Sequence, residues 1–170
     1  LGKLEGMSTK DKTDLYNVIG MGALKYFMLK VDPKKSMVFN PEESVDFTGN
    51  TGPFIQYTHT RICSILSNVD EKIGAIDLML AIEPCEKTLI KLLDDYPRII
   101  KEAGEKYSPS MVANYAYELV KGYNHFYQTV PILKVDDENI LNFRIVLSRK
   151  VKEVIASAMQ LLGVKMPERM

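Results

Sequence analysis

Residues 108–131 read SPSMVANYAYELVKGYNHFYQTVP, and their apolar side chains recur at intervals of three and four. The apolar positions of this stretch are Val112, Ala116, Leu119, Tyr123, Phe126, Tyr127 and Val130. Such intervals place side chains on one face of an α-helix, and the alternation of a β-strand is missing. The stretch therefore predicts one long amphipathic helix that ends at Pro131.

Two further long helices are predicted by the same kind of spacing. The last segment of the chain has an apolar face made of Leu141, Ile145, Val151, Val154, Ile155, Ala158, Leu161 and Leu162. Gly163 follows, and glycine is common just after a helix because it adopts left-handed backbone angles without steric cost. Near the start, residues 13–31 show similar spacing and should end as a helix at Asp32-Pro33, since proline disfavours helical angles in the residue before it.

Prolines divide the rest of the chain. Helical periodicity follows each of Pro41, Pro53, Pro84, Pro97 and Pro109. Because the first residue of a helix needs no partner for its N–H, each of these prolines predicts a helix start. The clearest start has Asn40 as the cap residue and Glu43 three residues later, and Ser108-Pro109 repeats the cap and proline.

These segments together indicate the fold class. Residues 70–82 are the least periodic region, and we expect a connector there with some helical content. The sequence has no internal repeat, no low-complexity tract and no hairpin signal, and its 170 residues suffice for one domain with a substantial core. We therefore predict an all-α helical bundle, with residues 1–170 as a single domain.

Composition is that of an ordinary globular protein, with 46% hydrophobic and 26% charged residues. No apolar run approaches the length of a membrane span, so we expect no membrane partner. The chain begins LGKLEGM, with neither an initiator Met nor the residue order of a signal peptide. We expect an internal piece of a longer protein or a trimmed chain, and a cytoplasmic location is predicted from the cysteine content.

Charge and cysteine content narrow the function classes. Lys plus Arg and Asp plus Glu each total 22, so the formal net charge is zero. Binding through phosphates alone usually needs a basic excess, so neutrality argues against nonspecific nucleic-acid binding but not against a local basic patch. Cys63 and Cys85 lack metal-ligand spacing and predict buried, reduced thiols.

Signals of catalysis are scarce. The segment GNTGP lacks the lysine of a phosphate-binding loop, and neither His59 nor His125 has the spacing of a zinc site. The paired carboxylates Glu42-Glu43 and Asp94-Asp95 are expected at helix ends, where the helix dipole accounts for them. We therefore predict no catalytic residue, no metal site and no cofactor in this chain.

Polar aromatic residues are the unusual feature. Residues 47–61 read FTGNTGPFIQYTHTR, in which a tight loop precedes a helix that places Tyr57 and Arg61 one turn apart on a single face. A second aromatic cluster, YNHFY, occupies residues 123–127. Such rings fit either ordinary core packing or a stacking platform for unstacked bases beside a cation. Spacing alone leaves both interpretations open.

Motifs in these regions resemble a known family. GALKYFMLKVDP, FTGNTGPFIQYTHTRICSIL, ELVKGYNHFYQTVPIL and the closing LLGVKMPERM resemble, in order, the C-terminal region of arginyl-tRNA synthetases. GNTGP with the following IQY and Arg61 is the most specific motif, and PERM is the second. Residues 22–26 resemble the DALRY signature, with Lys25 in place of its arginine, a change that we expect to affect a surface or interdomain contact. The HIGH and KMSK motifs of the catalytic domain are not present in the sequence.

The resemblance implies an anticodon-binding site. It assigns anticodon contacts to Gly49, Asn50, Tyr57, Arg61, Tyr127 and Met170. Glycine would let a base approach the backbone, the tyrosine rings would stack, and the arginine would meet a base face or a phosphate. The middle anticodon base of arginine tRNAs is cytosine, and we expect backbone groups to satisfy it because no Asp or Glu stands among these residues. Phosphate contacts or a merely solvated face are the two interpretations of Arg144, Arg149, Lys150 and Lys152.

The implied function is anticodon recognition within an arginine–tRNA ligase, whose full-length form uses ATP and Mg²⁺. Its partners would be arginine tRNA and the catalytic domain of the same chain, with no DNA. A helical protein-interaction module that binds no RNA is the alternative, favoured by the neutral charge and the apolar aromatic cluster.

Overall fold

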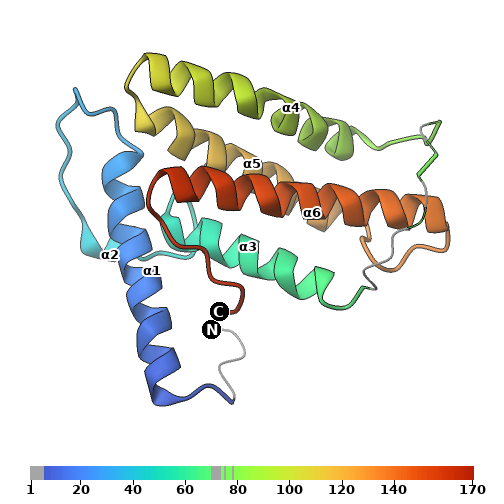
Figure 1. The fold of residues 1–170 in the computed structure, drawn as a ribbon, viewed down its shortest axis with the longest axis horizontal. Coiled ribbons are helices and arrows are strands. Elements are labelled where there is room, and N and C mark those ends of the chain that lie inside the picture. The colour runs from blue at the N-terminus through green and yellow to red at the C-terminus, as the bar shows by residue number, and fades with distance from the viewer. Residues whose placement is uncertain (1–5, 70–73, 75, 78) are drawn as a thin grey trace.

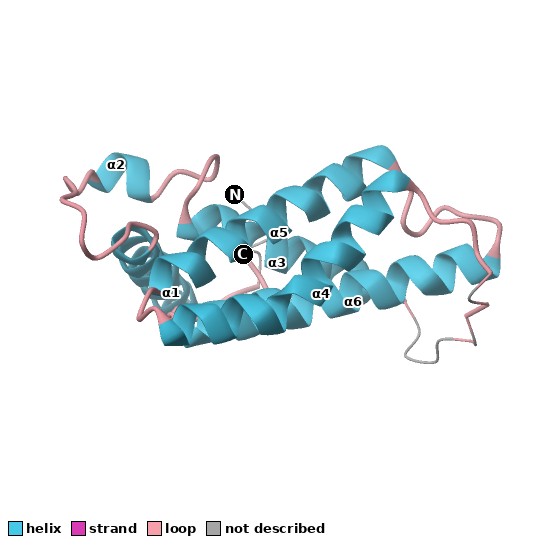
Figure 2. Cartoon of the chain, turned by 90° about the horizontal axis from the view of Figure 1, so that it is seen from above, coloured by secondary structure: helices cyan, strands magenta, loops and turns pink. Residues whose placement is uncertain are grey.

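Long helices account for most of the structure, a computed structural model that describes residues 6–69, 74, 76–77 and 79–170. Over these residues it contains six α-helices and no β-strand, which confirms the predicted all-α class. The helices are α1 (Thr9–Leu29), α2 (Pro41–Ser44), α3 (Gly52–Leu66), α4 (Pro84–Glu105), α5 (Pro109–Thr129) and α6 (Glu138–Leu161). Figure 1 shows α3 to α6 side by side as a bundle, with α1 crossing one end at a steep angle. In Figure 2, α1 is seen nearly along its axis.

The central helix is α5, whose predicted apolar face forms much of the core. Ala116, Leu119, Tyr123 and Phe126 are completely buried against α4 and α6. The hydroxyl of Tyr123 finds a partner inside the core, the Oγ of Ser148 on α6, at 3.2 Å. The helix ends two residues before Pro131, as predicted.

Helix starts follow capping side chains more closely than the apolar pattern. Asn40 caps α2 as expected, because its Oδ1 accepts from the backbone N–H groups of the first turn. Helix α1 begins at Thr9, four residues before the predicted start, because Ser8 and Asp11 cap it reciprocally. Its first turn is polar, so apolar spacing did not reveal it. Ser108 precedes α5 without capping it, since its Oγ pairs with that of Ser110.

Two predictions within α4 are wrong. Pro97 lies inside this helix and does not begin one. Packing on both sides overrides the proline, since Tyr96 stacks on Tyr115 of α5 at 5.3 Å and bonds to Ser157 of α6. Asp94-Asp95 is likewise in the middle of α4, and Asp95 forms an ion pair with Arg98 at 2.6 Å. Before α4, the described residues 74, 76–77 and 79–82 are not helical, whereas residues 70–73, 75 and 78 lie outside the described part.

The turn after α6 directs the end of the chain back over the bundle. Gly163 has φ +66°, as predicted for the residue that ends this helix, and the Val164 N–H donates to the Met159 carbonyl at 2.9 Å. Lys25 of α1 donates to the Gly163 carbonyl at 2.6 Å. Lys25 therefore makes a contact within this fold, to the turn that starts the C-terminal tail.

Candidate functional site

A close contact between α1 and α3 anchors the GNTGP motif, whose first residues form the loop before α3. A Cβ added to Gly52 would lie 2.6 Å from the carbonyl oxygen of Gly22, and one added to Gly22 would lie 2.5 Å from Nε2 of Gln56. Gly52 therefore admits no side chain, since its neighbour is backbone, whereas a side chain at Gly22 would have to displace the Gln56 amide. The GALKY and GNTGP motifs are thus two halves of one helix contact.

Gly49 and Asn50 lie in the loop just before α3. Gly49 has φ +76°, and a Cβ there would meet nothing within 4 Å, so its backbone angle and not crowding favours glycine. The side-chain Oδ1 of Asn50 accepts from the hydroxyl of Tyr26 at 2.6 Å. The backbone carbonyl of Asn50 accepts from Nζ of Lys30 at 3.0 Å. These bonds tie the loop to α1.

A groove of about 790 Å³ lies between α3, the end of α5 and the C-terminal tail. It brings together four of the predicted site residues, which come from three separate parts of the chain: Tyr57, Arg61, Tyr127 and Met170. Gly49 and Asn50 are not among its lining residues. Phe47 connects the loop to the groove, because its ring packs edge-on against Tyr57 at 6.3 Å.

Arg61 is held at the centre of this groove. Its guanidinium carbon lies 5.0 Å from the ring centre of Tyr57 and 5.0 Å from that of Tyr127. Nη1 donates to Oδ1 of Asn124 at 2.6 Å, and Asn124 donates in turn to Thr58 at 3.1 Å. The rings remain 40% and 43% exposed, so one cation and two open aromatic surfaces face the same space. Such an arrangement is suited to unstacked bases.

Sequence reasoning missed several residues of the site. Asn124, which holds Arg61, is not among the predicted residues, although its spacing of three from Tyr127 on a helix could have indicated it. Glu168 was not among the named residues and lines the groove beside them, so a carboxylate belongs to the site as well. Cys63 also lines it and is only partly buried, whereas Cys85 is buried as predicted; both thiols are free. Burial raises the pKa of both thiols.

The prediction that Arg144 meets phosphates is wrong. Its Nε donates to Oε1 of Glu86 at 2.6 Å, and its Nη1 donates to the carbonyl of Pro131 at 2.8 Å. The side chains of this ion pair are only 8% and 2% exposed. Lys150 is exposed and pairs with Glu153 at 2.6 Å, and Arg149 is partly exposed. For Lys150 and Arg149, a phosphate contact stays a prediction.

The fold is that of a helical anticodon-binding domain. The chain belongs to the DALR anticodon binding domain family, whose model matches residues 55–170. It is 55% identical over 170 residues to an arginine–tRNA ligase of Flavobacterium psychrophilum, covering 100% of this chain and 28% of that protein. It is 50% identical over 175 residues to that of Parabacteroides distasonis, covering 100% of this chain and 29% of that protein. The resemblance noted from the four motifs is confirmed.

Solved structures agree. The arginyl-tRNA synthetase of Thermus thermophilus matches 92% of this chain over 27% of its own, with a TM-score of 0.87 and 32% identity. That of Plasmodium falciparum matches 92% over 28%, with a TM-score of 0.82 and 25% identity. The chain thus spans less than a third of the length of these relatives. No helix in the described part is long and apolar enough to cross a membrane.

Proposed function

We propose that this domain recognises the anticodon of arginine tRNA within an arginine–tRNA ligase. The observation that carries the proposal is the convergence of Tyr57, Arg61, Tyr127 and Met170 on one groove. Splayed bases would stack on the exposed rings, with the guanidinium beside them. For the middle cytosine, backbone groups of the tail and the carboxylate of Glu168 are acceptors within the same groove.

Joining arginine to tRNA with ATP and Mg²⁺ belongs, in this proposal, to the rest of the full-length enzyme in the cytoplasm. Among the described residues, no group of three or more His, Cys, Asp and Glu side chains could hold a metal ion. In this proposal the domain contributes binding and orientation of the tRNA.

The exposed face of α1 is our candidate contact with that remaining part. Met21, Leu24 and Met28 lie at helical spacing and are 38% to 52% exposed, an apolar stripe on the helix that crosses the bundle end. The relatives are more than three times as long as the segment that they share with this chain, which leaves a large partner within the same polypeptide. In the full-length enzyme, Leu24→Glu should destabilise the domain contact while leaving the isolated chain folded.

The test of anticodon recognition uses an arginine tRNA anticodon stem-loop and a copy whose middle cytosine is guanine, at two salt concentrations. We expect tighter binding to the cytosine form, and Tyr57→Ala should remove the preference at a loss of about 1–3 kcal/mol. Affinity should also fall with salt. Equal affinity for both stem-loops would contradict the proposal and favour the protein-interaction alternative.

A further inference from the structure

The C-terminal tail, residues 164–170, is fastened to α3 through its backbone. Nε2 of Gln56 donates to the carbonyl of Lys165 at 2.9 Å. Nδ1 of His59 bonds to the carbonyl of Pro167 at 3.0 Å, and Thr60 donates to the same oxygen at 3.4 Å. Buried Val164 fixes the start of the tail. Side chains one turn apart on α3 thus hold two carbonyls that lie two residues apart in the tail.

These bonds end where the groove begins. Pro167 is bonded on α3, and the next three residues, Glu168 to Met170, line the groove. Adjacent sides of α3 therefore make different contacts. Gln56 and His59 hold the tail. Tyr57 and Arg61 face the groove. The position of Met170 depends on where the tail is held.

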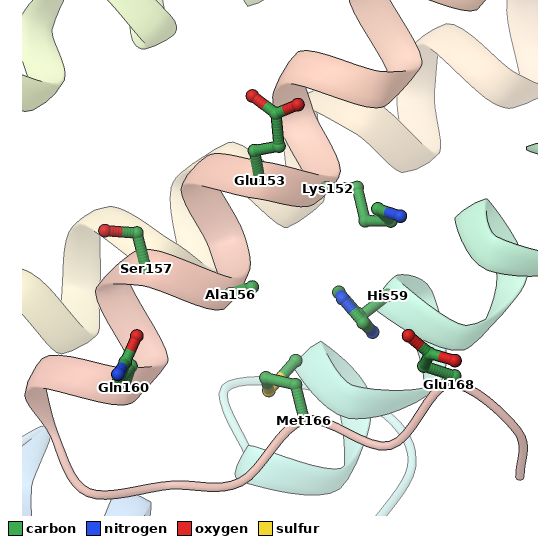
Figure 3. Close-up of a pocket in the computed structure, with 8 residues that line it drawn as sticks. All are labelled: His59, Lys152, Glu153, Ala156, Ser157, Gln160, Met166 and Glu168. Carbon is green, nitrogen blue, oxygen red and sulfur yellow. The ribbon is translucent and has the colours of Figure 1, made fainter.

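The contact with Pro167 determines which nitrogen of the His59 ring carries a proton. A carbonyl accepts only, so Nδ1 must carry the proton and donate. Figure 3 shows the ring between Lys152 of α6 and the tail residues Met166 and Glu168, in a hollow of about 420 Å³. Burial lowers the pKa of His59, with the nearby Lys152 acting in the same direction, while the Pro167 bond and Glu168 oppose it.

Gln56 is oriented at a cost that indicates the same role. Its Nε2 donates both to the tail and to the carbonyl of Val18 on α1, at 3.3 Å. Its Oε1 is buried without a hydrogen-bond partner in the described part of the chain. An unpaired buried acceptor is unfavourable. The two hydrogen bonds that Nε2 donates explain why the amide keeps this orientation.

We propose that Gln56 and His59 are positioning residues that hold the C-terminal tail on α3 and so place Met170 in the groove. The proposal rests on the proposed function of that groove. It assigns these side chains no contact with RNA: they act through the tail.

The test compares His59→Leu with His59→Asn, because the Asn amide can donate from about the position of Nδ1. The first readout needs no RNA: the NMR order parameters of the backbone N–H groups of Met166 and Glu168 to Met170 in the folded chain. We expect His59→Leu to lower these order parameters to below about 0.6, the flexible range, and His59→Asn to stay near wild type. Gln56→Met, which keeps the shape without donors, should also lower them while the thermal midpoint stays within about 2 °C.

The second readout is affinity for the stem-loop, with and without Met170. His59→Leu should weaken binding in the intact chain and cause no further loss once Met170 is deleted. Equal loss in both backgrounds, or unchanged order parameters of the tail in both the Leu and Gln56→Met variants, would overturn the positioning role. If the wild-type chain shows no cytosine preference, the proposed function fails, and the order parameters still decide whether α3 holds the tail.

Discussion

Two arginines in this bundle show how differently a folded chain can treat the same charge. Arg144 is buried between α6 and α4, where Glu86 neutralises it and a backbone carbonyl takes a second donor. Arg61 stands between two half-exposed rings and donates to the uncharged amide of Asn124. Neither ring nor amide carries a formal charge, so these contacts orient the guanidinium without cancelling it. One arginine is committed to the fold, and the other keeps its charge at an open groove.

The largest expected effect comes from breaking the buried pair. Glu86→Ala would leave the Arg144 guanidinium buried without its carboxylate, and it would also remove the acceptor of the Glu83 N–H at the start of α4. We expect a loss of about 3–5 kcal/mol in the free energy of unfolding, measured by urea denaturation. The double change Glu86→Leu with Arg144→Met should recover most of this loss. A cost below about 1 kcal/mol for Glu86→Ala would mean that the pair is not closed to water.

The same contrast between packed and open regions separates two glycines of the GNTGP motif. Gly52→Ala would force a Cβ against the backbone of Gly22 and should lower the free energy of unfolding by about 1–3 kcal/mol. Gly49→Ala meets open space and should lose about 1 kcal/mol, from its positive φ alone. Thermal or urea unfolding measures both changes. Equal effects would show that the α1–α3 contact can shift to admit a methyl group.

Arg61 should matter to binding and hardly to folding. Arg61→Ala should weaken stem-loop affinity by about tenfold while changing the free energy of unfolding by less than about 1 kcal/mol, because the site is open to solvent. Arg61→Lys should not restore affinity, since an ammonium group lacks the planar fork that fits between two rings and bonds to Asn124. If Lys restores affinity fully, the charge alone is used and the rings only pack beside it.

The sequence predicts those features that depend on residues close together in the chain. Local periodicity identified α5 and α6, and the Gly163 turn, because these depend on neighbours along the helix. The prediction for Arg144 failed because its partner, Glu86, lies 58 residues away in the chain. Pro97 misled for a similar reason, since contacts with α5 and α6 decide that α4 continues through it.

The residues of the groove could be predicted only from the resemblance of the motifs to a known family. The resemblance names four of its members, whereas composition and spacing leave both core packing and base stacking open for their rings. The structure adds what holds them: Asn124 against Arg61, and the α3 side chains that fasten the tail. These contacts join residues more than 60 positions apart, which no pattern along a single helix reveals.

The smallest expected effect is a pH dependence at His59. Its pKa is lowered in the folded state, chiefly by burial, so the unfolded chain binds the proton more readily. Stability from this group is therefore complete above the unfolded pKa of about 6.5 and declines as the pH falls toward the lower folded value. Asp46 and Glu102, whose pKa values are lowered by hydrogen bonds, lose their contribution only at more acidic pH. The difference in unfolding free energy between wild type and His59→Asn should thus shift in favour of the variant between pH 7 and about 5.5. A constant difference over that range would show that the ring titrates alike in both states, and that the hollow beside α6 is open to water.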